Sequence, residues 1–244
     1  MALMNRVGTN QPVRCLSAQM ATNLIDEKSK FDSSVSKGFT RTEVYSNSLA
    51  VILAGFETVA SSLQFITFSL CQHPHLQEEL YQEARTINTL SYNEVKEFPR
   101  LDAFIKETLR LYPPALVNTR YCVETTEISE NFTIEAGCSL VWSNLKFHMS
   151  DKIYANPEEF DPTRWTGNET NTLQDEAWFA FGQGPRACPG VRLAYYIMKI
   201  YVVTLLTNFE LVATENTPKV AKPVVKNSKL VSEKPLMVKL VKRN

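Results

Sequence analysis

The stretch FGQGPRACPG, residues 181–190, is the most distinctive segment of this sequence. Its glycines, prolines and arginine indicate a tight loop, and a helix is predicted to follow from Pro189 to Phe209. A cysteine at this position lies near the positive end of the helix dipole, and the charge of Arg186 is two residues away. Both effects favour the thiolate form of Cys188, which is a ligand for a soft metal centre. The alternative is a structural cysteine in a turn, the usual role of a lone cysteine.

The composition is that of an ordinary globular protein. The 244 residues include 26 basic and 26 acidic side chains, and 44% are hydrophobic, which excludes a disordered tail, a collagen-like fibre and a coiled coil. Zero net charge argues against nucleic acid as a partner. Five cysteines without close pairing argue against a disulfide framework and favour a reducing compartment.

No membrane-spanning segment is expected from the sequence. The longest uninterrupted apolar run, residues 49–56, is far shorter than the ~20 residues that a membrane helix needs. Residues 1–14 also lack the apolar block of a signal peptide. Any membrane association is therefore expected to come from surface contact or from sequence outside this chain.

Hydrophobic periodicity predicts a mainly α protein with a small β region. A polar lead-in and linker at 1–39 precede a long helix over 40–71, which begins at a capping box of Thr40 and Glu43. Because this helix is apolar on most faces, we expect it to run through the core. The other predicted elements are helices at 74–87, 101–111 and 189–209, strands at 119–123, 132–134 and 140–142, and a terminal hairpin at 229–240 with its turn at Pro235. This order excludes the βαβ alternation of a doubly wound sheet.

Two further motifs lie on predicted helices. Glu107 and Arg110 are three residues apart and share one helix face, which alone describes an exposed ion pair. The stretch AGFET, residues 54–58, places Gly55 inside the long helix, where glycine costs ~1 kcal/mol relative to alanine. Such a glycine allows close approach of a flat group, and Thr58 can bond the carbonyl four residues earlier or offer its hydroxyl to a ligand. A core helix that contains these residues by chance is the alternative.

Together these motifs resemble those of the cytochrome P450 monooxygenases. Residues 181–190 match the family's haem-thiolate loop, F-x-x-G-x-R-x-C-x-G, at every fixed position. The resemblance implies haem b as the cofactor, with the Cys188 thiolate as the axial iron ligand and Arg186 in contact with a haem propionate. The remaining fixed positions of the loop are assigned to cofactor binding as well: Phe181, Gly184 and Gly190.

A buried triad is implied by the same resemblance. Glu107 and Arg110 match the family's E-x-x-R pair, and Arg164 in FDPTRW, residues 160–165, matches the arginine that joins this pair. Two positions of that element depart from the family's pattern, since Thr163 replaces a glutamate and Trp165 replaces a phenylalanine.

The resemblance also assigns the oxygen side of the site and the substrate pocket. AGFET resembles the family's oxygen-activation segment, which makes Glu57 and Thr58 the catalytic acid–alcohol pair, although Val59 replaces a second hydroxyl residue often found there. Arg120 takes the position of an arginine that contacts the second propionate, with a surface strand charge as the alternative. Pocket-lining residues are expected on the long helix, in the turn at 115–119 and in the strand at 229–232: Ala54, Ala115, Leu116, Val117 and Leu230. The histidines show no ligand spacing and are assigned no chemistry: His73, His75 and His148.

The resemblance runs from about residue 40 to the C-terminus and is closest to the microsomal clan that includes family 3. Family members are roughly twice as long, so we expect residues 40–244 to be the C-terminal, haem-binding half of a P450 fold, without the N-terminal half and its anchor. For the full-length protein the resemblance implies the cytosolic face of the endoplasmic reticulum membrane. The implied partners are an NADPH-dependent cytochrome P450 reductase, cytochrome b5 as a second electron donor, O2 and an apolar small-molecule substrate.

Three functions are compatible with these motifs. The first is an O2-dependent monooxygenase that inserts one oxygen atom into an apolar small molecule. The second is a relative that rearranges peroxides without O2 or a reductase; such relatives often lack the threonine, so Thr58 favours the monooxygenase. The third is a truncated haem-binding fragment that is catalytically incompetent.

Overall fold

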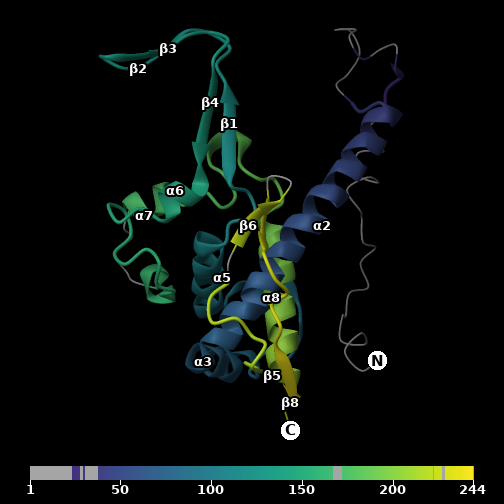
Figure 1. The fold of residues 1–244 in the computed structure, drawn as a ribbon. Coiled ribbons are helices and arrows are strands. Elements are labelled where there is room, and N and C mark those ends of the chain that lie inside the picture. The colour runs from purple at the N-terminus through teal and green to yellow at the C-terminus, as the bar shows by residue number, and fades with distance from the viewer. Residues whose placement is uncertain are drawn as a thin grey trace.

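The body of the molecule is helical, as the sequence predicts. The computed structural model describes residues 24–27, 30, 38–166, 172–221, 223–226 and 229–243. Within them, the helices of more than ten residues contribute to a shared core (Figure 1): α2 (Arg41–Gln72), α3 (Pro74–Ala84), α5 (Pro99–Leu111) and α8 (Val191–Asn208). The predicted lead-in and linker at 1–39 lie almost entirely outside the described residues.

Several short helices connect these elements. They are α4 (Tyr92–Lys96), α6 (Asn144–His148), α7 (Thr172–Glu176) and the 3-10 turns η4 (Pro162–Trp165) and η5 (Gly184–Arg186). Ser91 caps α4, because its hydroxyl accepts from the Glu94 amide at 3.4 Å. The Glu94 carboxylate accepts from the amides of Asn88 and Thr89 at 3.0 Å, so it closes the preceding turn.

The described strands form four antiparallel pairs. They are β1 (Val117–Tyr121) with β4 (Ser139–Ser143), β2 (Thr126–Ser129) with β3 (Phe132–Ile134), β5 (Phe209–Val212) with β8 (Lys239–Lys242), and β6 (Pro223–Lys226) with β7 (Lys229–Ser232). The β1–β4 ribbon projects from the helical body and carries β2–β3 at its far end (Figure 1).

The predicted terminal hairpin at 229–240 is wrong in its pairing. Residues 229–232 pair with β6, which precedes them, and residues 239–242 pair with β5 at the end of α8. The alternation of apolar and polar residues marks both strands correctly, but it carries no information about which edge each one meets. The turn around Pro235 therefore joins two different ribbons instead of closing one.

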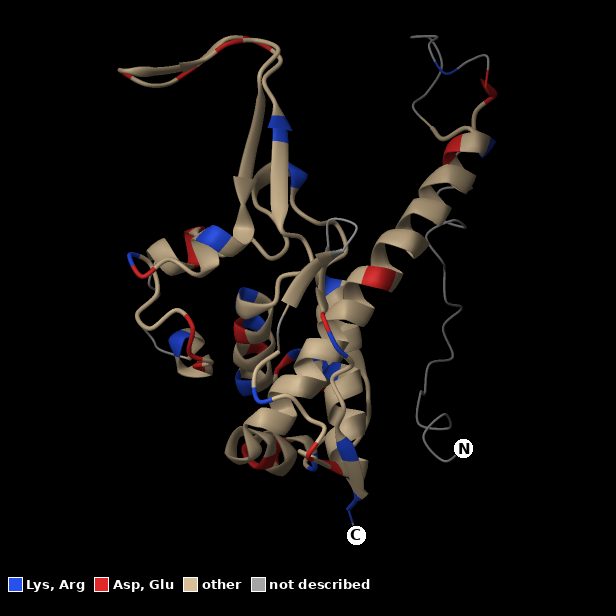
Figure 2. Cartoon of the chain, in the orientation of Figure 1, with Lys and Arg blue, Asp and Glu red and all other residues tan. Residues whose placement is uncertain are grey.

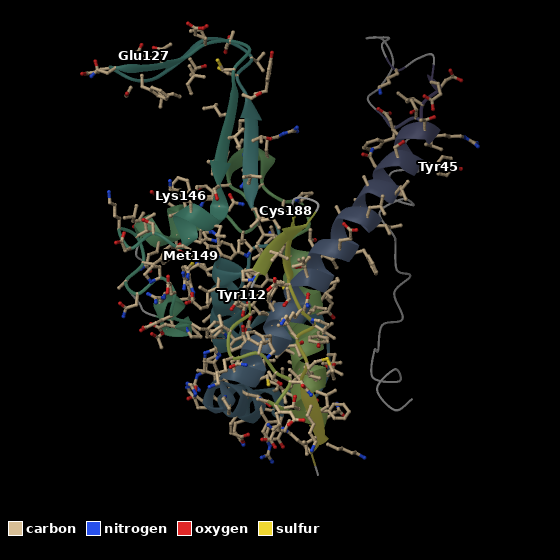
Figure 3. All side chains as sticks on the ribbon, viewed as in Figure 1. Tyr45, Tyr112, Glu127, Lys146, Met149 and Cys188 are labelled. Atoms are coloured by element: carbon tan, nitrogen blue, oxygen red, sulfur yellow. The ribbon has the colours of Figure 1, made fainter. Side chains whose placement is uncertain are left out.

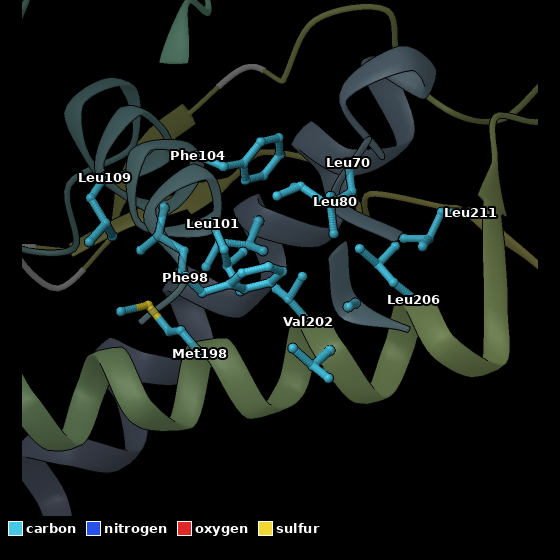
Figure 4. Close-up of a cluster of buried hydrophobic side chains, with 14 of the residues drawn as sticks. Leu70, Leu80, Phe98, Leu101, Phe104, Leu109, Met198, Val202, Leu206 and Leu211 are labelled. Atoms are coloured by element: carbon cyan, nitrogen blue, oxygen red, sulfur yellow. The ribbon is translucent and has the colours of Figure 1, made fainter. Parts of the chain in front are cut away.

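The core lies where α3, α5 and α8 meet the second half of α2. Figure 4 shows its larger side chains, which come from every one of these elements and from β5: Leu70, Leu80, Phe98, Leu101, Phe104, Leu109, Met198, Val202, Leu206 and Leu211. An ion pair between the buried Lys199 and the partly exposed Asp102 also joins α8 to α5, since Lys199 Nζ donates to the Asp102 carboxylate and to the Lys96 carbonyl, both at 2.7 Å. These contacts fix the position of α8, the helix that follows the cysteine loop.

The long helix α2 has two unlike halves. The predicted capping box forms at its start, where the Thr40 hydroxyl accepts from the Glu43 amide and the Thr40 amide donates to the Glu43 carboxylate. Phe65, Ile66 and Leu70 in the second half are fully buried. Large apolar side chains in the first half are 44–74% exposed: Tyr45, Leu49, Val51, Ile52, Leu53 and Phe56.

The expectation that this helix runs through the core therefore holds only for its second half. In the described part of the chain no helix or strand covers the first half as α3, α5 and α8 cover the second. Figure 2 shows α2 almost free of charge between its N-terminal turn and the middle of the helix, and in the sequence Glu57 is the next charged residue after Glu43. Apolar periodicity predicts the helix, but it does not say what covers each face.

By length and composition, α2 is the one helix among the described residues that is long and apolar enough to cross a bilayer. The sequence did not predict a helix of this kind, because Glu57 interrupts the apolar run at 49–56. A helix that is apolar on average can still contain one charged residue. Core helices of soluble proteins share this length and composition, so these two properties alone do not define a membrane span.

Candidate functional site

The cysteine loop follows α7 and leads into α8. Gly182 and Gly184 have φ values of 69° and 72°, in the left-handed region that glycine adopts without a Cβ clash. The Cys188 amide donates to the Phe181 carbonyl at 2.8 Å, and the Ala187 amide donates to the Gly184 carbonyl at 3.0 Å. These bonds close the loop, and the Cys188 side chain, whose position is labelled in Figure 3, is exposed.

The end of the loop differs slightly from the sequence prediction. Helix α8 begins at Val191 with Gly190 as its N-cap, so Cys188 stands two residues before the cap. A Cβ added to Gly190 would lie 3.8 Å from the Cys188 sulfur, which is an ordinary contact. The positive φ at Gly184 requires glycine, whereas the geometry at Gly190 does not.

Side chains from α7, β1 and the loop itself surround this turn. Gln183 Nε2 donates to the Glu176 carbonyl at 2.8 Å and so caps α7. Arg120 on β1 reaches the loop, with Nη2 3.5 Å from the Gln183 carbonyl and its guanidinium 5.4 Å from the centre of the Trp142 ring. Arg186 lies exposed on η5, within the loop. Two guanidinium groups are therefore available to an anionic ligand at this loop.

The Glu107–Arg110 pair is fully buried. Arg110 Nε and Nη2 each donate to a different oxygen of the Glu107 carboxylate at 2.9 Å, a bidentate geometry that strengthens an ion pair. The remaining Arg110 donors bind the carbonyls of His148, Pro157 and Glu159 at 2.6–3.0 Å. The pair is thus no exposed helix contact; it anchors the segment that precedes η4 to α5.

Residues in η4 and at its N-cap donate the remaining hydrogen bonds to the Glu107 carboxylate. Arg164 Nε lies 3.3 Å from Oε1, and the Asp161 amide donates to the same oxygen at 2.9 Å. Trp165 Nε1 donates to Oε2, also at 2.9 Å. The structure brings the three predicted triad residues together and adds the indole of Trp165 to them.

The two departures from the family's pattern have clear structural roles. The indole at Trp165 supplies an N–H donor to Glu107 that a phenylalanine would lack. At Thr163, the amide and hydroxyl both donate to the Asp161 carboxylate at the start of η4. The first change adds a donor to the buried carboxylate, and the second caps the turn that presents Arg164.

His148 is a residue that sequence reasoning missed. It is fully buried at the end of α6, its Nδ1 is 3.0 Å from the Arg110 carbonyl, and its Nε2 accepts from the Phe179 amide at 2.8 Å. Burial lowers the pKa of His148 to about 4; the hydrogen bond to the Arg110 carbonyl opposes this shift, and the Arg110 charge adds to it. The partners lie more than 30 residues away in both directions, so no local spacing could have revealed them.

The AGFET segment lies in the exposed half of α2. Thr58 Oγ1 donates to the Ala54 carbonyl at 2.7 Å, the first of the two options that the sequence left open. The Glu57 side chain is exposed, and a Cβ added to Gly55 would meet no atom within 4 Å. Gly55 therefore faces open space, not another part of the described chain.

The residues predicted to line a pocket occupy different environments. Ala115 and Val117 are exposed, whereas Leu116 is only 9% and Leu230 only 1% exposed. The Leu230 carbonyl accepts from Ser61 Oγ at 2.9 Å, which docks β7 on α2 one turn beyond Thr58. The turn at 115–117 is fixed by the buried Asn144, which donates to the Ala115 carbonyl at 3.0 Å.

The donor set at the loop fits a haem. In the part of the chain that the structure describes, no cluster of three His, Cys, Asp or Glu side chains could hold a bare metal ion. Cys188 supplies one exposed thiol in this loop, which suits an iron whose other ligands come from a porphyrin. Arg120 and Arg186 suit its propionates, and the open space at Gly55 and Gly184 leaves room for a flat group.

Comparison with known proteins identifies the family to which this chain is similar. The sequence pattern of the cytochrome P450 family matches residues 9–240. Cytochrome P450 3A7 of Homo sapiens is 31% identical over 91% of this chain and 44% of its own length. Lithocholate 6-beta-hydroxylase of Mesocricetus auratus is 30% identical over 98% of this chain and 48% of its own. Thromboxane-A synthase of Mus musculus is 34% identical over 76% of this chain and 36% of its own.

The chain therefore belongs to the cytochrome P450 family. The match to P450 3A7 agrees with the predicted resemblance to the clan that includes family 3. The mainly α fold with a small β region is also confirmed. The chain spans less than half the length of these curated relatives.

Proposed function

We propose that this chain forms the haem-binding part of an O2-dependent monooxygenase that acts on an apolar small molecule. The observation that carries the proposal is the cysteine loop: Cys188 is exposed, its amide is held by the Phe181 carbonyl at 2.8 Å, and Arg120 reaches the same loop. Family membership supports the assignment. Cys188 would hold haem b through its thiolate, and the haem would supply the redox chemistry for oxygen transfer to the substrate.

The protein residues bind, orient and deliver protons. Arg120 and Arg186 would hold the propionates, and the Glu107 cluster would fix the segments that support the loop. Thr58 donates its own proton to the Ala54 carbonyl, so its oxygen lone pairs remain available to accept a hydrogen bond at the site. Exposed Glu57, one residue earlier, exchanges protons with solvent and passes them toward Thr58.

Partners and location follow from the family and its named members. We propose an NADPH-dependent cytochrome P450 reductase, and cytochrome b5 as a second donor, for the electrons that O2 reduction requires. The name lithocholate 6-beta-hydroxylase supports hydroxylation of a steroid-like substrate. The microsomal clan supports the cytosolic face of the endoplasmic reticulum membrane.

A second candidate function is peroxide rearrangement, and one comparison favours it. Thromboxane-A synthase is 34% identical to this chain, and its name describes a synthase. A Thr58 hydroxyl next to an exposed acid is needed for proton delivery to O2 and has no evident use in an O2-independent rearrangement. We therefore favour the monooxygenase.

Isotope labelling separates the candidate functions. The haem-loaded 244-residue protein, with reductase, NADPH and a steroid probe under 18O2, should give a hydroxylated product that carries one 18O atom. A product formed from a hydroperoxide without NADPH or O2 would support the rearrangement instead. Haem binding without either product would support the catalytically incompetent fragment.

A further inference from the structure

We propose that His148 is a positioning residue whose neutral imidazole holds the cysteine loop in register with the end of α5. It is fully buried, and its two ring nitrogens contact two separate segments. One is the last turn of α5, next to the Glu107–Arg110 pair. The other is Phe179, nine residues before Cys188. This inference rests on the proposed function, because that function makes Cys188 the iron ligand.

The partners define the protonation state of the ring. The Arg110 carbonyl can only accept, so Nδ1 must carry the proton and donate. The Phe179 amide can only donate, so Nε2 must be unprotonated. One neutral tautomer satisfies both bonds, and a doubly protonated ring would lose the bond to Phe179.

Arg110 secures His148 a second time. While the His148 ring donates to the Arg110 carbonyl, the Arg110 guanidinium donates to the His148 carbonyl at 2.8 Å. The Trp178 ring stacks on the imidazole with 6.5 Å between ring centres. His148 is therefore held by the same arginine that binds Glu107. Through its bond to Phe179, it couples the position of the cysteine loop to the position of the Glu107–Arg110 pair.

A series of backbone hydrogen bonds continues from His148 to the cysteine. The Phe179 amide is held by His148, and the Phe179 carbonyl accepts from the Gly182 amide at 3.0 Å. Two residues on, the Phe181 carbonyl accepts from the Cys188 amide at 2.8 Å. A shift of Phe179 would thus disturb both of these hydrogen bonds and move the Cys188 sulfur.

Two substitutions separate positioning from simple packing. His148→Gln can place an amide oxygen where Nε2 was and keep the acceptor for the Phe179 amide. His148→Asn can place an amide nitrogen where Nδ1 was, which keeps the bond to the Arg110 carbonyl and loses the one to Phe179. The two side chains are similar in polarity, so a purely structural role predicts similar effects.

The first readout is amide hydrogen exchange of the full 244-residue chain without haem. We expect the amides of Gly182 and Cys188 to exchange at least about tenfold faster in His148→Asn than in the wild type, the loss expected for one hydrogen bond. In His148→Gln they should stay within about threefold of wild type. The Leu211 amide, which donates to Gln77 in the distant core at 2.8 Å, is the internal control.

The second readout is the spectrum of the reduced CO complex after haem loading. His148→Asn should convert a larger share of the thiolate-type band to an inactive form than His148→Gln does. Equal behaviour of the two variants in exchange, or unchanged exchange in His148→Asn, would overturn the positioning role. A wild-type protein without a thiolate-type band would instead overturn the proposed function, while the exchange result would still report on how His148 holds the loop.

Discussion

The two sides of the candidate site are built in opposite ways. On the cysteine side, α5, α6, η4 and the loop are joined by buried and fully paired polar groups, with Glu107 accepting five hydrogen bonds from four residues. On the α2 side, Glu57 is exposed and Thr58 bonds only to its own helix among the contacts described. The segments around the cysteine loop are therefore tied together by hydrogen bonds within the described residues, whereas the first half of α2 offers an open helix face.

This difference predicts where substitutions will be costly. Buried charge on the cysteine side makes the fold depend on single polar atoms, because an unpaired buried charge is expensive. On the α2 side, a changed side chain meets water and little protein, so chemistry should change more than stability does. The predictions that follow test this contrast from the largest expected effect to the smallest.

Glu107→Ala should have the largest effect. It leaves two buried guanidinium groups without their carboxylate, and we expect a loss of about 3–5 kcal/mol in the free energy of unfolding. Urea denaturation of the variant against wild type measures this loss. Glu57→Ala on the exposed face of α2 is the matched control and should change stability by less than about 0.5 kcal/mol. Similar losses in the two variants would remove the contrast between the two sides.

The acid sensitivity of stability should show the His148 contribution. Because burial lowers the pKa of His148 to about 4 from the ordinary 6.5, the unfolded state binds one more proton than the folded state between these values. Stability should therefore fall as pH drops from about 6.5 to about 4, by up to about 1.4 kcal/mol per pH unit from this residue. Above pH 6.5 the contribution is constant.

The comparison that isolates this contribution is wild type against His148→Gln. Arg110 and, beyond it, Glu107 are the charged groups that face the imidazole, and both remain in the variant, as do the surface carboxylates. Urea titrations at several pH values should give a steeper loss in wild type than in His148→Gln. Parallel curves for the two proteins would contradict the buried neutral state of the ring.

Trp165→Phe should have an intermediate effect. It restores the residue common in the family but removes the indole N–H that donates to Glu107 at 2.9 Å. Since Arg110 still binds the same oxygen, we expect a loss of about 1–2 kcal/mol. Thermal unfolding of the variant checks this, with Tyr92→Phe as a control for the loss of a polar group from a solvent-exposed aromatic side chain. A neutral or stabilising outcome would show that the indole bond contributes no net stability.

The sequence predicted much of the cysteine side and little of how it is held. Spacing alone placed Glu107 and Arg110 on one face, and the family pattern added Arg164. The sequence could not show that Trp165 donates to Glu107. It shows that Trp165 departs from the family's pattern, but not which residue the new side chain contacts. His148 was missed because its hydrogen bonds cross 31 and 38 positions of the chain.

The fold was predictable to a similar degree. The apolar periodicity of α2 and its capping box gave the helix almost to the residue. Its exposed first half was not predictable, because periodicity describes a side chain's character and not its neighbours. The strand pairing was predicted wrongly for the same reason. The sequence indicated β7 and β8, but their pairing with β6 and β5 depends on where α8 and α2 place the partner strands.

Thr58→Ala should have the smallest effect on stability and a specific effect on chemistry. It removes only a bond to the Ala54 carbonyl of its own helix, so we expect the free energy of unfolding to change by less than about 1 kcal/mol, with haem binding intact. Product formed per NADPH consumed should fall, because protons are then delivered less reliably. Thr58→Ser, which keeps the hydroxyl, is the control; unchanged coupling in Thr58→Ala would remove this residue from proton delivery.

The absorbance spectrum of the reduced CO complex tests the central claim most directly, because it reports whether a cysteine thiolate binds the haem iron. Wild type should show a thiolate-type Soret band, and Cys188→Ser should lose it with little change in stability, since one atom on an exposed side chain is replaced. Cys138→Ser, a second exposed cysteine just before β4, should keep the band. A thiolate-type band that survives in Cys188→Ser would contradict the assignment of Cys188 as the iron ligand.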